Sequence, residues 1–142
     1  MGTKLEQIKF SEQKQINVNG GDIFHIMKIS NNKNFVFREA YFSFVEKGFI
    51  KGWKKHSKMS SNLTVPIGEV EFTFVTDDFQ NYKKFILGEK NYGLLSIPPG
   101  IWFSFKGIDE GKNIILNLSN FEHDSSEVEK INLEDFPLKI KL

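Results

Sequence analysis

The feature that most constrains this chain is the alternation of apolar and polar residues along short segments rich in phenylalanine. In 69–75, Val70, Phe72 and Phe74 fall on one side of an extended chain and the residues between them on the other. Fifteen of the 142 residues are phenylalanine. No segment keeps apolar residues at helical spacing for three turns. The pattern therefore predicts an all-β protein.

Turn residues, rather than helices, separate the expected strands. Glu46-Lys47-Gly48 and Pro98-Pro99-Gly100 are two such breaks. The expected strands are 35–45, 49–55, 63–66, 69–75, 82–87, 93–97, 101–105 and 113–118. The acidic stretch 122–129 is expected to form a loop or one helical turn, and 131–142 an extended or short helical tail packed across the sheet. Strands without helical spacers favour a sandwich or jelly roll, here a single domain over residues 1–142.

Composition excludes several classes of function. The chain has no cysteine, so a disulfide scaffold, a thiolate zinc site and a cysteine nucleophile are all excluded. Nineteen basic and eighteen acidic residues leave a net charge of +1, which does not indicate binding to nucleic acid or to an acidic membrane. The first ten residues contain no apolar run typical of a signal peptide or a membrane span. We therefore expect a cytoplasmic protein.

The segment 47–58 is a local exception, because it carries five lysines and His56. It could bind an anion such as a diphosphate. Alternatively, its lysines could form a solvated edge that discourages pairing with other strands.

Three sequence segments, in this order and at this spacing, resemble the dTDP-4-dehydrorhamnose 3,5-epimerase family. Residues 49–56 read FIKGWKKH, residues 65–70 read VPIGEV, and residues 92–103 read YGLLSIPPGIWF. The resemblance covers about residues 40–120. It implies a cupin jelly roll, normally a homodimer, that acts on a nucleotide-linked 4-keto sugar. It also implies no metal and no redox cofactor.

The departures from this family concern its catalytic positions. Lys54 stands where the family has its base histidine, and the lysine that steadies the enolate falls near Ser61. Phe103 stands where the family has a second, later histidine. Residues 120–123 correspond to the region that in the family carries the tyrosine acting as the acid. The chain's length is closer to that of the related sugar 3,4-ketoisomerases, which carry two histidines two residues apart. Only the second of these histidines, His56, is present. Among the metal ligands that many other cupins carry, His56 is again the only one retained, so we expect no metal site.

Lys54, His56, Glu39 and Tyr41 are the candidate catalytic residues. Lys54 and His56 lie two apart on a predicted strand and so share a face. If that face lines the barrel, a lysine desolvated beside another cation could act as a base, with His56 as its partner or as the acid. Alternatively, both lie in water at the end of the strand. Glu39 and Tyr41 share a face of 35–45, although a tyrosine there is commonly a core residue.

Six residues are candidates for substrate binding. Each also has a structural interpretation: an arginine can pair on the surface, tryptophans can pack, and a lone histidine can be structural. The candidates are Lys51, Trp53, Arg38, His25, Lys28 and Trp102.

These observations lead to three hypotheses. The first is a nucleotide-sugar epimerase or isomerase of surface-polysaccharide synthesis that moves protons next to the ketone of an NDP-4-keto-6-deoxy sugar. The second is a sugar 3,4-ketoisomerase. The third is a non-catalytic cupin that binds a sugar nucleotide or a partner enzyme.

Overall fold

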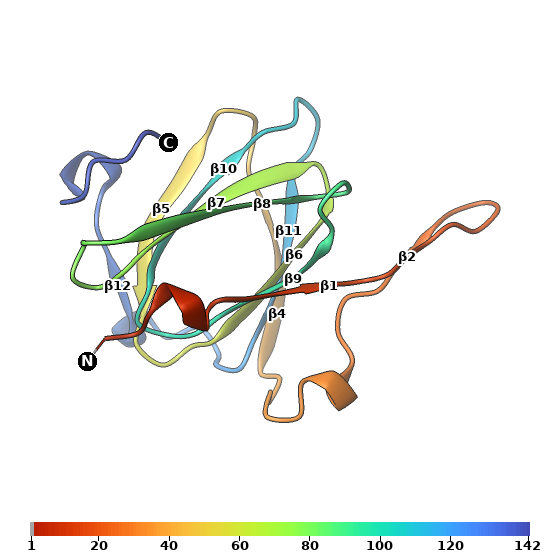
Figure 1. The fold of residues 1–142 in the computed structure, drawn as a ribbon, viewed down its shortest axis with the longest axis horizontal. Helices are drawn as coiled ribbons and strands as arrows, with labels where there is room; N and C mark the ends of the chain where they lie inside the picture. Colours follow the sequence, from red (N-terminus) through yellow and green to blue (C-terminus); the bar gives the residue numbers. More distant parts are fainter. Residues whose placement is uncertain (1) are drawn as a thin grey trace.

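Two antiparallel sheets of five strands each form the body of the protein (Figure 1). The structure is a computed structural model and describes residues 2–142. The first sheet contains, in spatial order, β1 (Lys9–Glu12), β9 (Gly93–Ile97), β6 (Ser61–Ile67), β11 (Ile114–Ser119) and β4 (Glu39–Phe44). The second contains β12 (Val128–Lys130), β5 (Ile50–His56), β10 (Trp102–Gly107), β7 (Glu69–Val75) and β8 (Tyr82–Gly88). The predicted all-β jelly roll is confirmed.

The remaining elements are small. A hairpin of β2 (Gln15–Ile16) and β3 (Ile23–Phe24) projects away from the barrel in Figure 1. Four single turns of 3₁₀ helix complete the fold: η1 (Leu5–Gln7), η2 (Ile29–Asn31), η3 (Ser125–Glu127) and η4 (Leu133–Asp135). Across residues 2–142, no helix has the length and hydropathy needed to cross a membrane.

The main core lies between the two sheets. Val70, Phe72 and Phe74 of β7 are fully buried there, as their alternation predicts. Leu95 and Ile115 of the first sheet belong to the same cluster. Each large side chain removed from water in this way contributes about 1.5–3 kcal/mol to the free energy of unfolding.

A second, smaller core lies on the outer side of the second sheet. Phe136 of the C-terminal tail stacks on Trp53, with ring centroids 3.9 Å apart, and meets the edge of Trp102. All three side chains are almost fully buried. The tail thus packs across the sheet as the sequence suggested, and it fixes the outer side of β5.

Two differences from the predicted strands have simple causes. The strand expected at 35–45 begins only at Glu39, because its partner β11 ends at Ser119, which is paired with Glu39. Strand β12 was not expected, since three residues are too few to show an alternating pattern. It forms because Val128 to Lys130 pair with His56 to Lys54 on the free edge of β5.

Candidate functional site

A cavity of about 560 Å³ lies between the two sheets. Its volume falls within the range of small-molecule sites, and apolar side chains with a few polar groups form its walls, as is typical of such sites. The apolar lining includes Met59, Leu63, Phe72, Phe103, Phe105 and Ile115. The polar lining includes Glu39, Tyr41, Ser43, Lys51, Lys54, His56, Asn117, His123 and Lys130.

His56 forms a close hydrogen-bonded pair with Glu127. Its Nδ1 contacts the Glu127 carboxylate, and its ring packs against Phe103 with centroids 6.0 Å apart. An ionised carboxylate accepts hydrogen bonds only, so in the neutral form of the ring Nδ1 carries the proton and Nε2 keeps a free lone pair. A histidine oriented in this way on a cavity wall can act as a general base.

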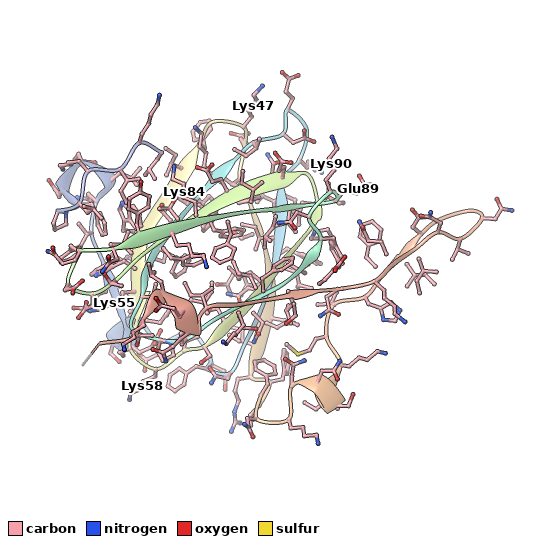
Figure 2. All side chains as sticks on the ribbon, viewed as in Figure 1. Lys47, Lys55, Lys58, Lys84, Glu89 and Lys90 are labelled. Atoms are coloured by element: carbon pink, nitrogen blue, oxygen red, sulfur yellow. The ribbon has the colours of Figure 1, made fainter. Side chains whose placement is uncertain are left out.

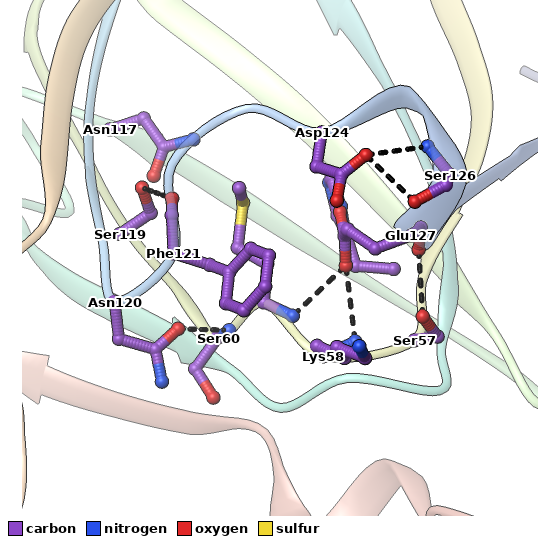
Figure 3. A network of polar contacts seen from close by, with 12 residues as sticks. Ser57, Lys58, Ser60, Asn117, Ser119, Asn120, Phe121, Asp124, Ser126 and Glu127 are labelled. Carbon is purple, nitrogen blue, oxygen red and sulfur yellow. Dashed lines mark hydrogen bonds and ion pairs between the residues drawn. The ribbon is translucent and has the colours of Figure 1, made fainter.

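The Glu127 carboxylate is held in place by the backbone (Figure 3). Its Oε2 accepts hydrogen bonds from the N–H groups of Lys58 and Met59, both at 3.1 Å. Burial opposes ionisation of this group, but the hydrogen bonds from His56 and from the two N–H groups outweigh it and lower the pKa of Glu127. Glu127 is therefore a fixed anion behind the histidine.

The loop that carries Glu127 is itself well anchored. The Asp124 carboxylate caps η3 by accepting from the Ser126 N–H at 2.9 Å and from the Ser126 hydroxyl at 2.7 Å. The Glu127 carbonyl accepts from the N–H of Ser57 at 2.8 Å and from its hydroxyl at 3.0 Å. These contacts join the loop to the end of β5 and fix the position of the Glu127 carboxylate; Figure 3 shows those made by the Ser57 hydroxyl and by Asp124.

Lys54 also lines the cavity, two residues before His56 on β5. Partial burial lowers the pKa of Lys54, and the positive charges of Lys130 and Lys51 lower it further. Lys51 and Lys130 line the same cavity, and the Lys51 ammonium donates to the Phe44 carbonyl at 2.6 Å. Three lysines therefore face one cavity.

The other lysines of the segment 47–58 face outward (Figure 2). Lys47 pairs with Glu110 at 3.0 Å, and Lys55 pairs with both Asp77 and Glu129 at 2.6 Å. The basic run is thus divided between the cavity, which receives Lys51 and Lys54, and the solvated outer surface.

Glu39 and Tyr41 reach the cavity from β4, on the sheet opposite His56. The Tyr41 hydroxyl accepts a hydrogen bond from the Asn117 side chain at 2.8 Å. The Tyr41 O–H proton therefore remains available for donation toward a ligand.

The two tryptophans do not lie where a ligand-stacking role requires. Trp53 and Trp102 are buried beneath the C-terminal tail, on the side of the sheet that faces away from the cavity. Along β5, Trp53 alternates with Lys54 and His56, so its side chain points to the opposite face of the sheet. We therefore assign both tryptophans to packing rather than to substrate binding.

Three other candidates lie outside the cavity. Arg38 borders a shallow depression formed with residues 120–125, and its backbone N–H donates to the Ser119 carbonyl. His25 follows the projecting hairpin, and its carbonyl accepts from the Tyr92 hydroxyl at 2.8 Å. Lys28 is exposed just before η2. None of the three belongs to the cavity lining, since the segments that carry them run outside the barrel.

Sequence reasoning missed Glu127, Lys130 and Asn117. Glu127 lies in the acidic stretch 122–129, expected to form a loop or one helical turn, and nothing in the local pattern separates it from Glu122 or Glu129. Lys130 reaches the cavity only because β12 pairs with β5. The one available signal was at Asn117, a polar residue at an inward position of an alternating strand. In the described part of the chain, residues 2–142, no three side chains of His, Asp or Glu gather as a metal site would require.

A family model described as "FdtA: WxcM-like, C-terminal" matches residues 6–136. None of the curated protein sequences matches the chain. Among solved structures, a dTDP sugar isomerase from Desulfovibrio desulfuricans G20 is 27% identical with a TM-score of 0.87, over 94% of this chain and 90% of the other.

Two further solved structures share the fold at lower identity. A sugar 3,4-ketoisomerase from Thermoanaerobacterium thermosaccharolyticum, in complex with TDP, is 21% identical with a TM-score of 0.76 and covers 92% of each chain. A dTDP-6-deoxy-D-glucose-3,5-epimerase from Legionella pneumophila Philadelphia 1, in complex with dTDP-4-keto-L-rhamnose, is 18% identical with a TM-score of 0.80, over 98% of this chain and 83% of the other. These matches confirm the resemblance found in the sequence.

Proposed function

Because the chain belongs to the WxcM-like, C-terminal (FdtA) family, we propose that it is an isomerase of nucleotide-linked keto sugars that works by proton transfer next to the ketone. The observation that carries the proposal is the His56–Glu127 pair in the wall of a sugar-sized cavity. The names of the neighbours support the same substrate class, a dTDP-linked sugar.

In this proposal His56 is the base. Its Nε2 removes the proton from the carbon beside the ketone, and the electron pair of that C–H bond becomes the double bond of an enolate. Glu127 stabilises the imidazolium that forms and keeps Nδ1 protonated throughout. This reverses the roles expected from the sequence, because no carboxylate among residues 2–142 pairs with Lys54, which serves better as a cation than as a base.

Two outcomes of the enolate are compatible with the cavity. If the proton returns to the same carbon from the opposite face, the product is an epimer, and Tyr41 on the facing sheet is placed to deliver it. If the proton returns to the former carbonyl carbon and the neighbouring hydroxyl loses its own, the ketone migrates from C4 to C3. One base on one face suffices for this second reaction, so His56 alone supports the 3,4-ketoisomerase alternative.

We further propose that the protein is a homodimer through the outer face of β4. In the part of the chain that the structure describes, this strand pairs only with β11, and Phe42 and Phe44 are 62% and 51% exposed on it. Four further apolar side chains are also more than half exposed: Val36 and Phe37 just before β4, Phe49 in the segment after it, and Ile67 at the end of β6, beyond β11 in the same sheet. At about 100 Å² each, the six present roughly 600 Å², close to one partner's share of a stable interface.

A second copy is the occupant that suits this surface, because the projecting hairpin offers matching apolar side chains at Ile16, Val18 and Ile23. Sedimentation of the wild type and of the Phe42→Lys/Phe44→Lys double variant tests the idea. A dimer that dissociates in the variant is expected, whereas a wild type that is monomeric at micromolar concentration refutes it.

The experiment for the proposed reaction is proton NMR in deuterated water with dTDP-4-keto-6-deoxyglucose and its UDP and GDP analogues. Deuterium at both C3 and C5 identifies a 3,5-epimerase. Deuterium acquired with migration of the ketone to C3 identifies a 3,4-ketoisomerase. No exchange, together with line broadening of the ligand, would instead favour the non-catalytic binder.

We also propose that the reaction takes place in the cytoplasm, as a step of surface-polysaccharide synthesis.

A further inference from the structure

Lys54 and Lys130 form an unusual pair of like charges. They are directly opposite one another across the antiparallel strands β5 and β12, and both side chains line the cavity. Like charges in this position destabilise a pair of strands. Among residues 2–142, no carboxylate lies within ion-pair distance of either ammonium. Glu39, the carboxylate that lines the same cavity, belongs to the opposite sheet.

Lys55, the next residue on the same strand, is a lysine whose charge is balanced by carboxylates. Lys55 faces outward and holds Asp77 and Glu129, both at 2.6 Å. Burial opposes its charge, yet those two carboxylates raise the pKa of Lys55, whereas burial and two like charges lower the pKa of Lys54. Within residues 2–142, the outward Lys55 is therefore paired with carboxylates, whereas the facing pair Lys54 and Lys130 has no anion.

We propose that Lys54 and Lys130 together form the oxyanion site of the reaction, so that Lys130 is a further catalytic residue. The inference depends on the isomerase function proposed above. Two positively charged groups on one cavity wall favour a ligand atom that gains negative charge. The other residues at the expected positions cannot supply this charge, since Ser61 and Phe103 are neutral.

The charge balance of the step fits this site. His56 Nε2 takes the proton from the carbon beside the ketone and becomes an imidazolium. The C–H electron pair forms the carbon–carbon double bond, and the carbonyl π pair moves onto oxygen. That oxygen becomes negative and lies between the Lys54 and Lys130 ammonium groups until the proton returns to carbon. No other reactant is needed.

The C-terminal tail fixes Lys130 in this position. The next residue, Ile131, exchanges two backbone hydrogen bonds with Trp53, of 3.0 and 3.1 Å. Trp53 in turn stacks on Phe136. Because the backbone is held from outside the cavity, replacing the Lys130 side chain should leave the strand pairing intact.

The test is the rate of deuterium exchange into the keto sugar for the wild type, Lys130→Met, Lys130→Arg and the control Lys90→Met. Lys90 is an exposed lysine on the turn between β8 and β9 (Figure 2). Loss of one oxyanion partner is expected to lower kcat by about 10²–10³-fold with little change in KM. The arginine variant keeps the charge and should retain most of the activity, and Lys90→Met should match the wild type.

A second readout separates a charge effect from a structural one. Removing Lys130 eliminates a like charge near Lys54, so the pKa of Lys54 rises and the alkaline limb of the residual activity moves to higher pH. If Lys130→Met exchanges at the wild-type rate, or if its alkaline limb does not move, the oxyanion role is wrong. If the wild type itself exchanges with none of the keto sugars, the isomerase proposal fails first. Lys130→Gln replaces Lys130→Met if the latter does not fold.

Discussion

Replacement of Glu127 by glutamine tests the His56–Glu127 pair with the smallest possible change in shape. The amide has one oxygen and one NH₂ group where the carboxylate has two acceptors. If its oxygen faces the N–H groups of Lys58 and Met59, the NH₂ group faces His56 Nδ1. The histidine must then accept at Nδ1 and carry its proton on Nε2, which makes it unable to act as a base.

The alternative orientation is also unfavourable. With its oxygen toward His56, the amide turns its NH₂ group toward two backbone donors, at positions now occupied by 3.1 Å hydrogen bonds. Loss of such charge-assisted bonds costs about 1–3 kcal/mol of the free energy of unfolding. For a chain of this length that lowers Tm by about 3–10 °C. Exchange activity should fall by about 10²–10⁴-fold, as for other bases that lose their orienting carboxylate.

The pH dependence of stability gives a second readout with a defined sign. The folded pKa of Glu127 lies below its ordinary value of 4.5, so its stabilisation is present above that pH and is lost as pH falls through the folded pKa. The difference in stability between wild type and Glu127→Gln should therefore be full at pH 7 and shrink below about pH 4.5.

The matched control is Glu129→Gln, two residues further along on β12. The Glu129 side chain is 62% exposed and pairs with Lys55 on the surface, an interaction of about 0–1 kcal/mol. Thermal unfolding and the NMR exchange assay are run on both variants. Equal exchange rates for the two variants would refute the assignment of Glu127 as the residue that orients His56.

Three further predictions concern other parts of the chain. Lys54→Met removes the other oxyanion partner and should lower the exchange rate by about 10²–10³-fold. It should also raise the free energy of unfolding by about 0.2–1 kcal/mol, because it removes a like-charge pair across two strands; a less stable variant would contradict this. Phe136→Ala should lower the free energy of unfolding, measured by chemical denaturation, by about 3–5 kcal/mol. It should also shift the tryptophan fluorescence, since it exposes Trp53 and Trp102; unchanged fluorescence would exclude a packed tail. The exchange rate of the wild type should begin to fall at a pH below 10.5, the ordinary pKa of lysine, because the pKa of Lys54 is lowered and its positive charge is lost at lower pH. A rate that stays constant up to that pH would argue against a charged Lys54.

The fold was readable from the sequence because inward and outward residues alternate so regularly. Strands β7 and β9 have the bounds expected from their patterns, and Val70, Phe72 and Phe74 are buried together. The same alternation placed Lys54 and His56 on one face. It also places the Trp53 side chain on the opposite face of β5, where Trp53 packs against Phe136.

The rest of the site depends on contacts distant in the sequence. Glu127 lies 71 residues from His56, and only the path of the loop after β11 brings the two together. Lys130 reaches the cavity by pairing of a three-residue strand whose own pattern is uninformative. Such pairings follow from which edge of the barrel is free, and that is a property of the assembled fold.

The most direct test of the account is the rate of deuterium incorporation at C3 of dTDP-4-keto-6-deoxyglucose by the wild type and by His56→Gln, with both proteins shown to be folded by their unfolding curves. We predict incorporation by the wild type and a loss of at least about 10²-fold in the variant, as expected when a general base is removed. Incorporation at the same rate by both proteins would contradict the role of His56 at the centre of the site.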